Sequence, residues 1–263
     1  MSGGDFVLVF QSKRVTLLFP LWGTEMKLTI VIPHKSTPLT DEALRLCLKI
    51  LRENSCEPQR FNEQYEVVIP QGGEVYQMYN DGGRQARADN LLYLNNDMFM
   101  GPGWDKHMFD HLDDNALVTG YVVEPGVIKV ALQNILKDFG RTADTYRREK
   151  FDNFARYRQA KTPTVRNFRG WYMPLFLTKG LIDRLGGYPT DNSPYAPNDV
   201  RYFRHCAEAG VHVRQVNFYC YHLQGLSEAA HDPKRRTTLT SRMRNIGAHI
   251  KREVKRLRST HSV

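Results

Sequence analysis

The segment LLYLNNDMFMGPGWD, residues 91–105, decides more about the fold than any other part of the chain. An apolar run over residues 91–94 ends abruptly at Asn95, Asn96 and Asp97, and a Gly-Pro-Gly turn follows. A short apolar run that is closed by turn residues is typical of a buried strand. Open α/β sheets bind their ligands just beyond the carboxyl ends of such strands. The sequence therefore predicts polar side chains at the ligand-binding edge of a sheet.

The polar residues after this strand favour a metal site. Asp97 is a hard oxygen donor, and Asn95, two residues earlier, is expected on the same side of an extended chain. This arrangement suits a divalent cation that holds a diphosphate. The alternative is a strand followed by an Asx-type turn that binds nothing.

Strand and helix patterns alternate on the amino-terminal side of this segment. LTIVIP (28–33) and YEVVIP (65–70) are β-branched runs that predict buried strands. Between them, apolar residues from 44 to 51 follow a helical spacing, and Thr40 is expected to cap that helix. A shorter helix is expected over residues 74–86, although two glycines weaken its pattern. The alternation predicts an α/β fold with a mostly parallel central sheet flanked by helices.

The second half of the chain continues this pattern less regularly. Residues 116–125 predict a strand, and the basic, aromatic-rich stretch 129–169 predicts a mobile or helical insert. PNDVRYFRHCAEAG predicts a compact helix with Asn198 as its N-cap and with Val200, Phe203 and Ala207 facing inward. VHVRQV and FYCYHL then predict two closing strands.

The net charge of +9 is confined to the carboxyl-terminal tail. Residues 233–263 hold ten of the 37 Lys and Arg residues and one of the 28 acids, so 27 basic and 27 acidic residues remain elsewhere. A nucleic-acid-binding face should draw on the domain itself, so the neutral remainder disfavours a nucleic-acid partner. We expect an extension over residues 1–26, one domain over 27–230 and a basic amphipathic helix over 231–263. That helix packs on the domain or lies on an anionic membrane surface.

The composition predicts a globular protein of a reducing compartment. Hydrophobic residues make up 41% of the chain, and no apolar stretch is long enough to cross a bilayer. The first 25 residues lack the cleavage site of a signal peptide. We therefore expect a cytoplasmic protein, peripheral at a membrane if the tail binds lipid. Four cysteines without metal-ligand spacing are expected to be free thiols: Cys47, Cys56, Cys206 and Cys220.

Four segments occur in the order that is typical of one enzyme family. They are LTIVIPHK, then YNDGG followed by ARADNLLYLNND, then PNDVRYFRHCAEAG, and finally CYHLQG. Together they resemble the family 2 glycosyltransferases, over residues 27–225. The resemblance implies a single Rossmann-like domain of the GT-A type and an inverting, metal-dependent transfer. A hexose or deoxyhexose would pass from a nucleoside-diphosphate-sugar donor to a glycan or glycoconjugate acceptor.

The resemblance also implies roles for individual residues. Asp97 and His222 would hold the metal, and the nitrogen donor of His222 favours Mn²⁺ over Mg²⁺. Asp199 would be the general base. The expected donor-binding residues are Pro33, His34, Lys35, Glu74, Asn80, Asn95 and Asn96. The expected acceptor-binding residues are Trp171, Tyr172 and Asn198.

The chain departs from the family pattern at three places. The loop after the second strand, QGGE, has Glu74 where the family often places Asp-Asp-Gly-Ser, so only Glu74 is left to contact the nucleotide base. Asn95 replaces the first carboxylate of an Asp-x-Asp motif. Asn198 replaces the usual Glu, so the role of base falls on Asp199 alone.

Each of these residues also has a plainer interpretation. His222 would be an ordinary strand histidine with one hydrogen bond, and Asp199 would only stabilise a helix N-terminus. Trp171 and Tyr172 would be a buried aromatic pair instead of a platform for an acceptor sugar.

Three other functions compete with sugar transfer. A nucleotidyltransferase of the same fold usually has a glycine-rich loop after the first strand, and the segment Pro-His-Lys-Ser at residues 33–36 has no glycine. A non-catalytic sugar-binding protein would explain the two asparagine replacements. A basic nucleic-acid-binding protein would explain the sequence pI of about 9.4.

Overall fold

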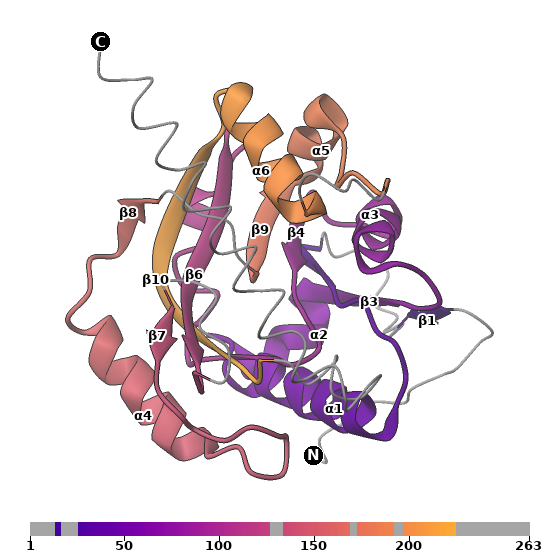
Figure 1. Cartoon of the computed structure of the whole chain (residues 1–263). Coiled ribbons are helices and arrows are strands. Elements are labelled where there is room, and N and C mark those ends of the chain that lie inside the picture. The colour runs from indigo at the N-terminus through magenta and orange to yellow at the C-terminus, as the bar shows by residue number, and fades with distance from the viewer. Residues whose placement is uncertain (1–13, 17–25, 127–133, 169–172, 192–196, 225–263) are drawn as a thin grey trace.

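A ten-stranded sheet with helices on both faces forms the centre of the molecule (Figure 1). The computed structural model describes residues 14–16, 26–126, 134–168, 173–191 and 197–224. The strands are β1 (Arg14–Thr16), β2 (Leu28–Val31), β3 (Tyr65–Pro70), β4 (Asn90–Tyr93), β5 (Met98–Met100), β6 (Ala116–Glu124), β7 (Ile135–Leu136), β8 (Val165–Asn167), β9 (Leu175–Thr178) and β10 (His212–His222). The helices are α1 (Pro38–Glu53), α2 (Phe61–Gln64), α3 (Val75–Gln85), α4 (Arg148–Gln159), α5 (Lys179–Leu185) and α6 (Asn198–Glu208), with 3₁₀ turns at Pro58–Arg60 and Phe109–His111.

Most of the central strands run in one direction. The strand order is β1-β3-β2-β4-β9-β6-β10-β5, with β7 beside β6 and β8 beside β10. β2 pairs in parallel with β3 and β4, and β6 pairs in parallel with β10. β9 is antiparallel to both β4 and β6, so β2, β3, β4, β6 and β10 share one direction. The predicted α/β fold with a mostly parallel sheet is confirmed, and the carboxyl ends of these five strands meet at one edge.

Two features of the sheet differ from the sequence-based expectation. The antiparallel insertion of β9 was not predicted, because an apolar run indicates burial and says nothing of strand direction. The two closing strands are a single strand, β10, whose register with β6 shifts between Gln215 and Tyr219. The break between the two predicted strands coincides with this irregularity within one strand.

The helices divide between the two faces of the sheet. α1 and α4 cover one face, where Cys47 and Phe151 join the larger hydrophobic core. α3, α5 and α6 cover the other face through side chains such as Tyr79, Leu181 and Phe203. The basic insert is therefore helical in part, since α4 lies within it. None of the helices in the described residues is long and apolar enough to cross a bilayer.

The N-cap of helix α1 lies three residues before the expected one. Thr37, not Thr40, is the N-cap: its Oγ1 accepts from Thr40 N at 3.2 Å, while Thr40 Oγ1 accepts from Thr37 N at 2.9 Å. Pro38 occupies the first turn, where its missing N–H is not needed. The predicted apolar face is confirmed, because its members are all buried: Leu44, Cys47, Leu48 and Leu51.

The cysteine prediction is confirmed, and several other predictions fall outside the described residues. All four cysteines are free thiols, and only Cys56 is exposed. The basic helix expected over 231–263 and most of the extension 1–26 lie outside the described residues.

Candidate functional site

The Asn95-Asn96-Asp97 triplet forms a tight turn between β4 and β5 at the carboxyl edge of the sheet. Met98 N donates to Asn95 O at 3.2 Å and closes the turn. The expectation that Asn95 and Asp97 share one side of an extended chain is therefore wrong, because the chain has already left the strand. The side chains of the triplet are fixed by contacts with other elements.

Two of these contacts hold the asparagines. Asn95 Oδ1 accepts a hydrogen bond from the Tyr79 hydroxyl of α3 at 2.7 Å. Asn96 Nδ2 donates to His34 Nδ1, just beyond β2, at 2.8 Å. The amide groups that were expected to meet the donor thus anchor the turn to two neighbouring elements.

Asp97 is the buried acid of the turn. Its side chain is 5% exposed, and its Oδ1 has no hydrogen-bond partner among the residues that the structure describes. His222 Nε2, at the carboxyl end of β10, lies 3.6 Å from this oxygen. A buried carboxylate oxygen without a partner is unfavourable unless another group completes it. The structure therefore brings Asp97 and His222 together as predicted.

Glu124 orients His222, and the sequence analysis missed this residue. The parallel register of β6 and β10 sets Val123 beside Tyr221, so Glu124 and His222 follow side by side. Glu124 Oε1 lies 2.8 Å from His222 Nδ1, and Gln224 Nε2 donates to Glu124 Oε2 at 3.2 Å. Since a carboxylate faces Nδ1, that nitrogen carries a hydrogen and Nε2 is directed at Asp97.

The pKa of His222 reflects these neighbours. Burial lowers the pKa of the imidazole, but the Asp97 and Glu124 carboxylates outweigh burial and raise it above its ordinary value. A proton and a cation would therefore compete for the space between Asp97 and His222.

These residues fit a divalent ion that a ligand completes. The unpartnered oxygen of Asp97 and the directed nitrogen of His222 supply two donors. Within the described ranges, no group of three or more His, Cys, Asp or Glu side chains is arranged to hold a metal ion. Sites for Mg²⁺ and similar ions at nucleotides commonly use one or two carboxylates, with phosphates and water as the other ligands. The pair therefore suits a metal–phosphate complex better than a closed structural site.

The residues after β2 support the turn more than they face a ligand. His34 is 3% exposed, and its Nε2 lies 2.7 Å from Asp41 Oδ1. Both ring nitrogens are thus engaged, so a direct contact with a donor would break one of these hydrogen bonds. Pro33 is buried, whereas Lys35 is exposed at the same edge.

Glu74 and Asn80 both have partners within the protein. Glu74 is the N-cap of α3, where its carboxylate accepts from Tyr76 N at 3.0 Å. Asn80 makes two 2.8 Å hydrogen bonds with the main chain of Tyr188, one through Nδ2 and one through Oδ1. Glu74 is exposed beyond β3, so its predicted contact with the nucleotide base stays a prediction.

Asp199 lies in the first turn of α6. The helix starts at Asn198 after Pro197, so Asn198 is its first residue and not its N-cap. Asp199 is half-buried, and its Oδ1 accepts from Val200 N at 2.8 Å. Burial raises the pKa of Asp199, although hydrogen bonds from the main chain and from the Tyr76 hydroxyl oppose the shift. Burial, and not the position at the start of α6, is therefore the largest influence on the pKa of Asp199.

The inward face of α6 also differs from the prediction. Its buried side chains include Tyr202, Phe203 and Cys206, whereas Val200 is half-buried and Ala207 is exposed. The helix starts one residue earlier than expected, because its N-cap is Pro197 and not Asn198. Phe203 is the member of the predicted set that is buried.

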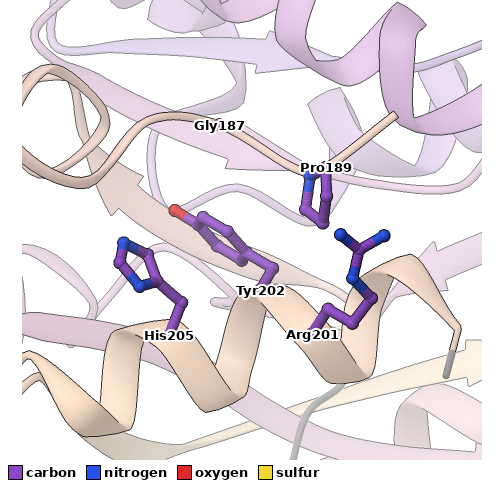
Figure 2. Close-up of a pocket in the computed structure, with 5 residues that line it drawn as sticks. All are labelled: Gly187, Pro189, Arg201, Tyr202 and His205. Atoms are coloured by element: carbon purple, nitrogen blue, oxygen red, sulfur yellow. The ribbon is translucent and has the colours of Figure 1, made fainter. Parts of the chain in front are cut away.

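A hollow of about 240 Å³ lies between α6 and the loop that follows α5. Figure 2 shows Arg201, Tyr202 and His205 along the helix, with Gly187 and Pro189 opposite. Arg201 Nη1 is paired with Asp191 Oδ1 at 2.8 Å. Arg201 and His205 lie one turn apart on a flank of α6, about a quarter-turn or more from Asp199. The hollow is therefore not on the face that carries the candidate base.

Of the three predicted acceptor-binding residues, Asn198 lies within the described part of the chain. Trp171 and Tyr172 lie outside the described residues. Asn198 is buried, and its Oδ1 accepts from Arg201 Nη1 at 3.3 Å.

Comparisons with known proteins identify no family for this chain. No protein-family model and no curated protein sequence matches it. Among solved structures, a mutant Drosophila β-1,4-galactosyltransferase 7 in complex with manganese, UDP-Gal and xylobiose is 10% identical, with a TM-score of 0.46 over 73% of this chain and 65% of that one. GalNAc-T7 with UDP, GalNAc and Mn²⁺ is 14% identical, with a TM-score of 0.45 over 75% of this chain and 44% of that one.

A third similar structure is S. aureus TarS in complex with UDP. It is 10% identical, with a TM-score of 0.44 over 74% of this chain and 60% of that one. The chain thus spans less than two-thirds of the length of these solved structures. At such identities and TM-scores they resemble the chain only in the outline of the backbone, so the function has to rest on the site itself.

Proposed function

We propose that the protein is a metal-dependent, inverting glycosyltransferase of the family 2 type. It would transfer a hexose or deoxyhexose from a nucleoside-diphosphate sugar to a glycan or glycoconjugate acceptor. The observation that carries the proposal is the unpartnered, buried oxygen of Asp97 that faces His222 Nε2 at the carboxyl edge of the sheet. That edge is where open α/β sheets bind nucleotides.

Asp97 and His222 would hold the cation, and the cation would be Mn²⁺ or Mg²⁺. When bound, it would neutralise the charge that develops on the departing diphosphate. Glu124 keeps the His222 ring in place by its hydrogen bond to Nδ1. Asn95 and Asn96 keep the turn rigid, so Asp97 needs little reorganisation to bind.

Asp199 would accept the proton of the acceptor hydroxyl. The hydroxyl oxygen forms a bond to the anomeric carbon as the bond from that carbon to the diphosphate oxygen breaks, and the nucleoside diphosphate leaves. A single displacement of this kind inverts the anomeric centre. A pKa raised above the ordinary value of aspartate suits a base, since general bases work best with a pKa near the working pH.

The main alternative is a nucleotidyltransferase on the same fold. Such an enzyme needs mobile, basic and glycine-rich chain after the first strand to bind a triphosphate. Here that position holds His34, which is buried and hydrogen-bonded on both ring nitrogens. This observation favours sugar transfer.

A panel of nucleotide sugars with Mn²⁺ tests the proposal. Release of the nucleoside diphosphate should occur with one or a few donors. Asp199→Asn should retain donor affinity, and its transfer rate should fall by about 10²- to 10⁴-fold, the usual contribution of a general base. Asp191→Asn is the matched control, because Asp191 is an exposed carboxylate that is paired with Arg201. If Asp199→Asn turns over normally while Asp191→Asn loses activity, Asp199 is not the general base.

A further inference from the structure

Besides helix α3, two neighbours hold the turn that carries Asp97. On the side of β10, Leu223 N donates to Asp97 O at 3.0 Å. On the side of β2, Asn96 Nδ2 donates to His34 Nδ1 at 2.8 Å. Asn96 and His34 are 5% and 3% exposed, so water competes little for this hydrogen bond. The residue next to the candidate metal ligand is therefore anchored by a buried histidine.

A carboxylate of helix α1 fixes which ring nitrogen of His34 carries the hydrogen. Asp41 Oδ1 lies 2.7 Å from His34 Nε2. The other oxygen of Asp41 accepts from Ser36 Oγ at 2.9 Å. A carboxylate accepts hydrogen bonds, so Nε2 carries the hydrogen and donates it. In the neutral ring, Nδ1 is then an acceptor.

The acceptor at Nδ1 determines how the Asn96 amide is turned. The two ends of an amide are nearly equal in shape, so packing alone does not choose between the NH₂ group and the oxygen. The reversed amide would set Oδ1 of Asn96 against the lone pair of His34 Nδ1, in a place where an unmade hydrogen bond is costly. Asp41 thus acts on the turn through two hydrogen bonds in series.

Regular structure supports both ends of this series. The main chain of His34 continues β2 beside β3, where its N–H donates to Pro70 O at 3.0 Å. Asp41 lies near the start of α1, and its N–H donates to Thr37 O at 2.8 Å. The histidine and the carboxylate are therefore held by different elements, a strand extension and a helix, which fix their separation.

From this geometry we propose that Asp41 and His34 are positioning residues of the metal site, which act through Asn96 and touch neither the cation nor the nucleotide. We call the three side chains the His34 relay. This inference rests on the proposed function and deepens it. Asp41 lies outside the four segments that resemble the glycosyltransferases, and His34 receives a role other than direct contact with the donor.

The hydrogen on the His34 ring tests the relay without any ligand. ¹⁵N NMR of the imidazole nitrogens reports which nitrogen is protonated, and His34→Gln identifies the signals by their loss. Wild type should carry a hydrogen on Nε2 and none on Nδ1. Asn96→Asp places a carboxylate at Nδ1 and should draw a hydrogen onto that nitrogen as well. A hydrogen on Nδ1 of wild type would overturn the proposal.

Asp41→Asn and Glu42→Gln separate the relay from the general effect of an acid near a helix start. Both variants remove one negative charge from neighbouring positions of α1, and Glu42 is exposed. The second readout is the dissociation constant of UDP, GDP, ADP or dTDP in the presence of Mn²⁺, measured by calorimetry. Thermal unfolding checks that each variant is folded.

We expect the two variants to differ in both readouts. Asp41→Asn should let the hydrogen occupy either nitrogen of the His34 ring and should weaken nucleotide binding by about three- to tenfold, the range for one lost hydrogen bond. Glu42→Gln should leave the ring unchanged and the affinity within about twofold. If folded Asp41→Asn alters the ring but not the affinity, or matches Glu42→Gln in both readouts, Asp41 does not position the site.

Failure of the relay and failure of the proposed function give different results. If wild type binds Mn²⁺ and a nucleoside diphosphate but transfers no sugar, and Asp41→Asn weakens that binding, the proposed function fails while the relay stands. If wild type transfers sugar and Asp41→Asn binds the nucleotide equally well, the relay fails alone. If wild type binds no nucleotide under any of these conditions, both fail.

Discussion

At the scale of single residues, the candidate site is held by a few buried polar contacts. Glu124 is the clearest example, since it is 5% exposed and its carboxylate serves both His222 and Gln224. Gln224 has a φ of 35°, a left-handed conformation that is uncommon outside glycine and that often occurs at functional sites. These neighbours indicate that Glu124 fixes the orientation of the His222 ring.

Replacing Glu124 should therefore weaken metal binding. Glu124→Gln keeps the size of the side chain but removes the charge that faces His222 Nδ1. Partners of metal-binding histidines typically contribute about 10- to 100-fold in affinity. We expect Mn²⁺ affinity to fall by about tenfold or more in calorimetry, with normal thermal unfolding. Unchanged affinity would mean that the His222 ring does not need this carboxylate.

Asp199 gives a prediction about stability. Its folded-state pKa is raised by burial, so the unfolded chain ionises at lower pH than the folded one. The stability present below the unfolded pKa, about 3.9, is therefore lost as pH rises through the folded pKa. Asp199→Asn removes this loss and should be more stable than wild type at pH 7. Urea unfolding from pH 4 to 7 checks this, and a gain that does not grow with pH contradicts it.

Some residues of the candidate site could be predicted from the sequence, and others could not, for physical reasons. The family resemblance paired Asp97 with His222, and the structure brings His222 Nε2 within 3.6 Å of Asp97 Oδ1, because β4 and β10 both end at the same edge of the sheet. Glu124 was missed, although a lone acid in the apolar run ALVTGYVVEP was a signal of a buried, partnered carboxylate. The role of His34 could not be foreseen, since its partner Asn96 depends on how the turn leaves β4.

At the scale of elements, the glycines of α3 show how tightly that helix packs on the sheet. A Cβ on Gly82 would lie 2.2 Å from Val31 Cγ1 and 3.1 Å from Pro70 Cγ. Val31 is a β-branched residue in a buried strand, so it cannot easily move aside. The glycine that weakened the helix pattern in the sequence is what lets α3 approach β2 and β3.

Gly82→Ala should accordingly destabilise the protein. Alanine improves helix propensity by about 1 kcal/mol, but overpacking of a filled core opposes it by about 1–3 kcal/mol. With a contact this short we expect overpacking to win and the free energy of unfolding in urea to fall. Gly73→Ala is the matched control, because its Cβ would meet only Met78 Cγ, at 3.4 Å. An equal or greater stability of Gly82→Ala would contradict the packing described for α3.

Element bounds were predictable where local chemistry decides them. The second strand was predicted over residues 65–70, and β3 has those bounds. The start of α1 was misplaced because Thr37 and Thr40 bond each other, and either threonine suits a cap when seen alone. The direction of β9 depends on its pairing with β4 and β6, which no local pattern encodes.

At the scale of the whole molecule, charge separates the domain from its tail. Removing residues 233–263 would change the formal net charge from +9 to zero, because 27 basic and 27 acidic residues remain. We expect full-length protein to be retained on heparin at moderate salt and the truncated protein to pass through. Equal retention of both would show a basic face on the domain and would favour a nucleic-acid partner.

The central claim is that Asp97 and His222 bind a divalent cation together with the diphosphate of a nucleotide. Calorimetric titration of a nucleoside diphosphate, with and without Mn²⁺, into wild type and Asp97→Ala tests this claim most directly. Asp183→Ala, a change at an exposed acid of α5, is the control. We predict Mn²⁺-dependent binding to wild type and to the control, and a loss of more than about 100-fold in Asp97→Ala, since an uncompensated diphosphate loses several kcal/mol. Equally tight binding to folded Asp97→Ala would contradict the account.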